Sequence, residues 1–132
     1  YVAMTGAIGQ VTPCWNQNNI ASNQSSVALT LLGSTAMTEI VMAAPGDIVG
    51  ISVAASGARS DGSLTVRASI NGVESTVLSA VLNATNTQRA ETIIQHSRIS
   101  FLEGQRVGMR ITTSLGFAPE TLNVTSNLFI LF

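Results

Sequence analysis

The chain of 132 residues is short of charge. Charged residues make up 10% of it, and all six basic residues are arginines, so lysine does not occur. An ordinary soluble domain has about 25% charged residues. Lysine commonly protects exposed sheet edges, and surface charge keeps a monomer soluble. A chain so poor in charge is therefore expected to cover much of its surface with copies of itself or with a partner protein.

Further absences argue against two classes of partner. The net charge is −1, and the sequence shows no basic stripe of the kind that binds nucleic acid. Apolar runs are short, and none reaches the ~20 residues that a membrane-spanning helix needs. The sequence therefore predicts neither nucleic-acid binding nor insertion into a membrane.

Residues that carry catalysis or bind metals are also scarce. One cysteine, Cys14, and one histidine, His96, are too few for a zinc site within one chain, although three copies of His96 around a symmetry axis could bind a metal. Asp47 and Asp61 stand in turn-like sequences, and no G-x-S-x-G motif accompanies them. Cys14 is expected to be an inert thiol. We predict a protein that is not an enzyme and that uses no cofactor and no metal.

The sequence does contain clear two-residue alternation of apolar and polar side chains. In Ser63–Ile70 every second residue, beginning at Leu64, is apolar. Successive side chains of a strand point to opposite faces, so this pattern predicts a half-buried β-strand. The dipeptide Asn71-Gly72 follows at once and is the strongest short-range signal for a tight hairpin.

Similar segments recur along the chain at regular spacing, with turns between them and no convincing helix. Within Ile48–Ala54, Val49, Ile51 and Val53 are expected on one face. The other expected strands are Val27–Leu32, Ala36–Ala43, Leu64–Ile70, Val73–Leu82, the end of Ala90–Phe101, Arg106–Thr113 and Leu122–Phe132. This spacing is typical of an antiparallel sandwich or barrel. We predict an all-β chain with an N-terminal arm and polar loop over residues 1–26 and a β-sandwich domain over residues 27–132.

The last predicted strand is apolar on both faces. Leu128 and Ile130 fall on one face, whereas Phe129 and Leu131 make the opposite face apolar too. A strand that is apolar on both faces is buried on both faces. We therefore predict a subunit interface at Phe129, Leu131 and Phe132, with local cover by the N-terminal arm as an equal alternative.

Trp15 stands beside amides in the segment Pro13–Asn19. An aromatic ring next to amides could stack on a sugar. A tryptophan more often plugs a core or anchors a contact with another protein, and we favour this interpretation.

Two stretches carry a recurring set of strand and turn residues. They are PGDIVGISVAASGARSDGSLTVRASINGV at Pro45–Val73 and ISFLEGQRVGMRITTSLGFAPETLNV at Ile99–Val124. Their Gly-Asp, Asn-Gly and Thr-Thr elements resemble the β-sandwich modules of phage capsid-decorating proteins and of head or tail fibres. The resemblance covers about the last two thirds of the chain. It implies a jelly-roll-like domain, usually a homotrimer, without catalytic residues.

Together these observations predict a jelly-roll-like β-sandwich of about eight strands that forms a homotrimer on a virion. The expected role is capsid decoration, in which the trimer, made in the host cytoplasm, reinforces the capsid surface through the major capsid protein or other virion proteins. Many weak contacts gain strength by avidity when a trimer meets a repeating lattice. The residues expected to contact the lattice are Tyr1, Trp15, Asn16, Asn18 and Asn19.

Two other functions stay open at this point. A receptor- or glycan-binding fibre head would use Trp15 and Phe117 with the loops around Arg59 and Asp61, and affinity for a sugar would reveal it. A self-assembling surface filament would use its apolar last strand to complete a neighbour's sheet, and polymerisation would reveal it.

Overall fold

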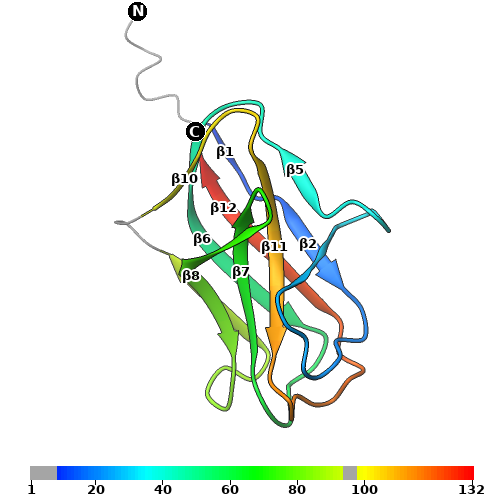
Figure 1. Ribbon diagram of the computed structural model, residues 1–132. Helices are drawn as coiled ribbons and strands as arrows, with labels where there is room; N and C mark the ends of the chain where they lie inside the picture. The colour runs from blue at the N-terminus through cyan, green and yellow to red at the C-terminus, as the bar shows by residue number, and fades with distance from the viewer. Residues whose placement is uncertain (1–8, 94–97) are drawn as a thin grey trace, which may run out of the picture.

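The structure, a computed structural model, describes residues 9–93 and 98–132. Within these residues every regular element is a β-strand, and two antiparallel sheets pack face to face (Figure 1). The predicted all-β sandwich is confirmed. The described residues form twelve strands rather than about eight because several segments of two or three residues pair with the long strands.

The seven-stranded sheet, sheet A, is built around two long neighbouring strands near its centre. Its members are β1 (Gln10–Val11), β2 (Cys14–Gln17), β4 (Thr30–Leu31), β6 (Gly46–Ala55), β9 (Arg89–Ile93), β10 (Ile99–Phe101) and β12 (Val124–Leu131). β12 pairs with β6 on one side and with β2 on the other, and β1 pairs with its end. β9 and β10 both pair with β6, and β4 extends the sheet beyond β2.

The five-stranded sheet, sheet B, is centred on its longest antiparallel pair. Its members are β3 (Val27–Ala28), β5 (Glu39–Val41), β7 (Leu64–Ile70), β8 (Val73–Leu82) and β11 (Arg106–Thr113). β11 pairs with β7 on one side, and with β3 and β5 on the other. β7 and β8 form the predicted hairpin. Its turn residues Asn71 and Gly72 have positive φ angles of 53° and 81°, as a tight hairpin turn requires.

The core fills the space between the sheets, and the alternation places its residues there. Along β7, Leu64 and Val66 are fully buried, whereas Arg67 points outward. On β6 the expected alternation is interrupted, since Ile48 rather than Val49 joins Ile51 in the core. The register between β6 and β12 shifts at this point, with Phe129 opposite Gly50 and Ile130 opposite Ile48. Val49 is thus the extra residue of a β-bulge, which lets two isoleucines three positions apart face the same core.

Within the expected N-terminal segment 1–26, residues 14–17 are part of the sandwich, so the sandwich includes residues before the expected start at residue 27. Cys14–Gln17 is β2 and lies inside sheet A between β12 and β4. Trp15 and Ile20 are fully buried in the core. The Trp15 indole nitrogen donates a hydrogen bond of 2.9 Å to the carbonyl of Thr38. The polar composition of this segment concealed a strand with one large inward side chain.

The predicted strand Val27–Leu32 also divides into two. β3 belongs to sheet B and β4 to sheet A, so the chain crosses from one sheet to the other at Leu29. Leu29 is fully buried, and its backbone nitrogen donates to the carbonyl of Met109. Alternation alone did not reveal this crossing, because the residues on both sides of it keep the same apolar period.

We expect Trp15→Ala to lower the free energy of unfolding by about 3–5 kcal/mol, because the change leaves a large cavity and a carbonyl without its donor. Denaturant unfolding at a fixed protein concentration measures the effect. Leu115→Ala is the control, since this loop side chain is 78% exposed and its loss is expected to cost less than about 0.5 kcal/mol. A loss below about 1 kcal/mol for Trp15→Ala would contradict its place in the core.

Candidate functional site

The outer face of sheet B is a paired, charged surface. The Arg67 Nε lies 3.6 Å from a carboxylate oxygen of Glu74, and the Arg106 Nε lies 3.2 Å from one of Glu39. The Ser26 hydroxyl donates to the same Glu74 carboxylate at 2.7 Å. Charges paired in this way are compatible with water, so this face is expected to stay exposed.

The outer face of sheet A is different, because its central strand is apolar there. Phe129 and Leu131 point away from the core and are partly exposed, whereas Leu128 and Ile130 are fully buried beneath them. The burial pattern places one apolar set of this strand toward the core and the other outward. The subunit contact predicted for the outward set stays a prediction, and the alternative cover by the N-terminal arm involves residues 1–8, which lie outside the described residues. Ile93, which pairs with Gly50 beside Phe129, is 67% exposed. Together Ile93, Phe129 and Leu131 give this face a connected apolar area.

Polar but uncharged side chains occupy the rest of the central strands on this face. The Ser52 hydroxyl donates to the Asn127 amide oxygen at 2.9 Å, and the Thr30 hydroxyl donates to the Asn16 carbonyl at 3.0 Å. The strands β2, β4 and β12 contain no charged residue. Charged groups on this face of the described chain are confined to the side formed by β6, β9 and β10.

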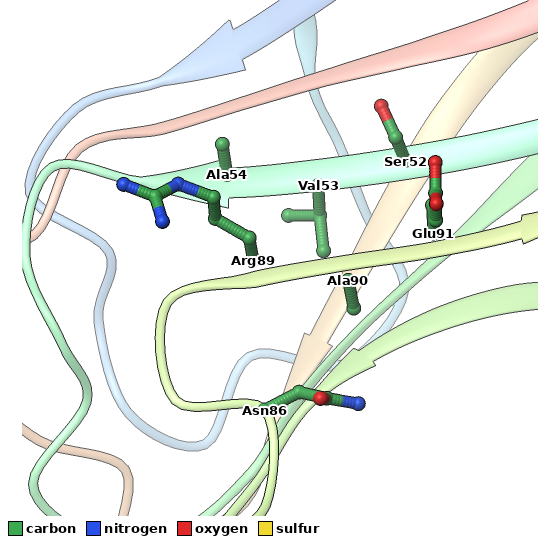
Figure 2. Close-up of a pocket in the computed structure, with 7 residues that line it drawn as sticks. All are labelled: Ser52, Val53, Ala54, Asn86, Arg89, Ala90 and Glu91. Atoms are coloured by element: carbon green, nitrogen blue, oxygen red, sulfur yellow. The ribbon is translucent and has the colours of Figure 1, made fainter.

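A shallow trough runs along β6, because its outward side chains are small. Gly50, Ser52 and Ala54 form its floor, and the larger outward residues of β9 and β12 form its sides. One recess in this trough has a volume of about 520 Å³ and is bordered by Arg89 and Glu91 (Figure 2). The remaining residues that line this recess are Val53, Asn86 and Ala90 together with Ser52 and Ala54. We call this feature the β6 trough.

One end of the sandwich is a second exposed apolar surface. Val41 and Leu102 are 64% and 67% exposed there, and the ring of Phe132 packs edge-on against Phe101 with centroids 6.2 Å apart. A groove of about 470 Å³, lined by Val11, Val41, Phe132 and their neighbours, opens beside that ring. The C-terminus, β1 and the turn after β10 meet at this end, and the loop after β2 lies at the other (Figure 1).

Two of the residues assigned to contacts from the sequence are buried. Trp15 has no exposed surface, and Phe117 is 2% exposed. Neither ring can stack on a sugar or pack against another protein, so the lattice contact of Trp15 and the ligand role of Phe117 are corrected. The reason is the same in both cases: each ring closes one part of the core. The burial of Trp15 agrees instead with the favoured interpretation of a tryptophan that plugs the core.

The other assigned residues lie at the surface or outside the described part. Asn18 and Asn19 are exposed in the loop after β2, and Asn16 is half-buried on the outer face of sheet A. Asp61 is exposed, and its carboxylate accepts a hydrogen bond from the Gly62 backbone nitrogen at 2.8 Å. Arg59 is partly buried, with its backbone nitrogen bonded to the Thr87 carbonyl. Tyr1 and His96 lie outside the described residues.

Three outward residues of β9 were missed, although a signal for them exists. Arg89, Glu91 and Ile93 alternate with Ala90 and Thr92, which is the pattern of a strand with one outward face. The sequence analysis predicted a strand only at the end of Ala90–Phe101. It therefore overlooked the two charged side chains beside the trough.

Other kinds of site find no support in residues 9–93 and 98–132. No group of three or more His, Cys, Asp or Glu side chains comes together among them. Cys14 is a free thiol. None of these residues belongs to a helix long and apolar enough to cross a membrane.

Comparison with known proteins shows what the chain is similar to. No family model matches, and no curated protein matches by sequence. Among solved structures, the globular domain of a zebrafish complement 1qA protein has a TM-score of 0.50 and 15% identity, with 92% of this chain and 96% of that chain covered. The acid-stable capsid structure of Helicobacter pylori bacteriophage KHP30 has a TM-score of 0.53 and 6% identity, with 95% and 93% covered.

The likeness is one of fold. Both similar structures cover nearly the whole chain, so the twelve strands form one jelly-roll-like sandwich of a kind found in a phage capsid and in a complement domain. Identities of 15% and 6% carry no residue assignment across. The surfaces described above are therefore interpreted from their own chemistry.

We expect Glu74→Gln on the outer face of sheet B to change the free energy of unfolding by less than about 1 kcal/mol, because ion pairs at the surface that remain partly open to water contribute little. The variant is also expected to have the same oligomeric mass in solution as the wild type. Denaturant unfolding and light scattering measure the two quantities. A variant that changed the assembly would contradict the assignment of this face to solvent.

Proposed function

We propose that the protein is a virion structural module that forms a homotrimer through the outer face of sheet A and decorates a capsid. The observation that carries the proposal is the outward pair Phe129 and Leu131 on a central strand of sheet A. The fold supports it, since a phage capsid structure shares this architecture over 95% of the chain. The resemblance of two sequence stretches to decoration and fibre modules points the same way.

The two sheet faces explain why assembly should use sheet A. Burying apolar surface stabilises a contact by roughly 25 cal/mol per Å². Burying the ion pairs of sheet B would instead incur the cost of removing charges from water. The low overall charge of the chain is thus unequally divided between the faces. The uncharged strands β2, β4 and β12 can be covered by another copy at small cost.

In this arrangement the ends of the sandwich contact the capsid. Asn18 and Asn19 remain the proposed contact residues at one end. The other end offers Leu102 and the groove lined by Val11 and Val41, an apolar surface of the kind that protein interfaces use. Phe132, which borders this groove, remains proposed for the subunit contact with Phe129 and Leu131. Whichever end makes the contact, the trimer lies on the capsid surface of the virion against the major capsid protein.

The alternative functions have less support. Sugar binding loses its two aromatic rings, because Trp15 and Phe117 are buried. Filament growth by strand addition needs a free edge on the last strand, but β12 is paired with β6 on one side and with β2 and β1 on the other.

We expect the purified protein to have three times its chain mass of 13.7 kDa in size-exclusion chromatography with light scattering. Phe129→Asp should produce a monomer at micromolar concentration, because a carboxylate would be buried at the contact. Val77→Asp is the matched control, since Val77 is an exposed strand residue of sheet B and should leave the trimer intact. A wild-type monomer would overturn the proposal.

Attachment can be tested by co-sedimentation with empty shells assembled from the major capsid protein of the same virus. Leu102→Arg and Asn18→Arg alter opposite ends of the sandwich. Because Leu102 borders a recess that also contains Leu131, light scattering first checks that its variant is still a trimer. We expect one of the two variants to lose binding by at least about tenfold while remaining a trimer, since a single misplaced charge at a contact typically costs more than 1 kcal/mol. Shells that fail to bind the wild-type trimer would refute capsid decoration.

A further inference from the structure

The side of the β6 trough formed by β9 carries two opposite charges that are not paired with any residue of the described part of the chain. Arg89 and Glu91 are both exposed and both face outward from sheet A. Within the described residues neither side chain takes part in an ion pair. Figure 2 shows the guanidinium of Arg89 extending along Ala54, away from the carboxylate of Glu91.

Glu91 shares a recess with the apolar residues that assembly is proposed to bury. This recess, of about 240 Å³, is bordered by Glu91, Gly50, Ile93 and Phe129. A neighbouring copy that covers Phe129 therefore also lies over the recess that Glu91 borders. An unpaired buried carboxylate is strongly unfavourable, so assembly requires a cation at this position.

The described arginines leave one candidate for that cation. Three of them already have a carboxylate partner: Arg67, Arg98 and Arg106. Arg110 belongs to sheet B and donates to the Ser26 carbonyl at 2.8 Å. Arg59 has a buried Nε and is bonded through its backbone to the loop at the end of the sandwich. Arg89 remains, on the same face as Glu91.

We propose that Arg89 of one copy pairs with Glu91 of the next copy, so that a closed ring of three contains three identical ion pairs. This inference rests on the proposed trimer and identifies the contact that specifies it. In a cyclic assembly each copy presents one surface to one neighbour and a different surface to the other. Arg89 and Glu91 lie two residues apart on one face of β9, so a ring of three makes this contact with both neighbours where β9 lies beside the three-fold axis. The side chains on the floor of the β6 trough are small, so the trough has room for a side chain of the neighbouring copy.

Charge reversal tests the pairing. Arg89→Glu and Glu91→Arg should each raise the concentration at which half of the trimer dissociates, on the order of a hundredfold or more, because like charges then meet at every contact. The double variant, with both reversals, should return to within about tenfold of wild type, since the pair is restored with opposite polarity. Sedimentation equilibrium over a range of protein concentrations measures all three.

Two controls separate the loss of the ion pair from a change in net charge and from a loss of folding. Glu103→Arg reverses a carboxylate in an exposed turn and changes the net charge as much as Glu91→Arg, but should leave the trimer unchanged. The neutral variants Arg89→Gln and Glu91→Gln should weaken the trimer in the same direction with less effect on folding. Circular dichroism checks that each variant retains its β-sheet.

The outcomes distinguish the two proposals. A wild-type monomer would overturn the trimeric function itself. A wild-type trimer that Phe129→Asp dissociates, but that both single reversals leave intact, would overturn the ion pair alone. A double variant no better assembled than the singles would also overturn it, because the two side chains would then not face each other.

Discussion

The antiparallel pairing of β6 with β12 is the constraint on which the rest of the structure depends. The last strand of the chain lies inside sheet A, between a long strand from the middle of the sequence and a short one from its beginning. Its register decides that Leu128 faces the core and that Phe129 faces outward. A slip by one residue would exchange the two faces, so the core and the outer face are determined together.

The bulge at Val49 adjusts this pairing and shapes the surface. Without the extra residue, Ile48 and Ile51 could not both reach the core. The same segment brings Gly50 opposite Phe129, and a Cβ added at Gly50 would stand 3.1 Å from the Cβ of Phe129. A glycine there gives the aromatic residue its room. The bulge therefore determines both which small residues form the floor of the β6 trough and which apolar side chains lie beside it.

The scarcity of charge has a structural meaning once the two outer faces are compared. Sheet B carries two ion pairs across neighbouring strands, Arg67 with Glu74 and Arg106 with Glu39, and its Arg110 donates to a backbone carbonyl. Sheet A carries few, placed along one side, and five of its seven strands carry none. One face therefore suits water, whereas the other suits another copy of the chain. The proposed function is accordingly argued from these surfaces.

The sequence by itself determined the all-β class, the hairpin at Asn71-Gly72 and the two apolar faces of the last strand. These features depend on near neighbours, because side-chain alternation and turn geometry are local. Only the tertiary structure decided that Trp15 closes the core and that β2 enters sheet A. It also placed Glu91 in a recess with Phe129. Such placements join residues far apart in the chain, and strand order across a sheet leaves no periodic trace in the sequence of any one strand.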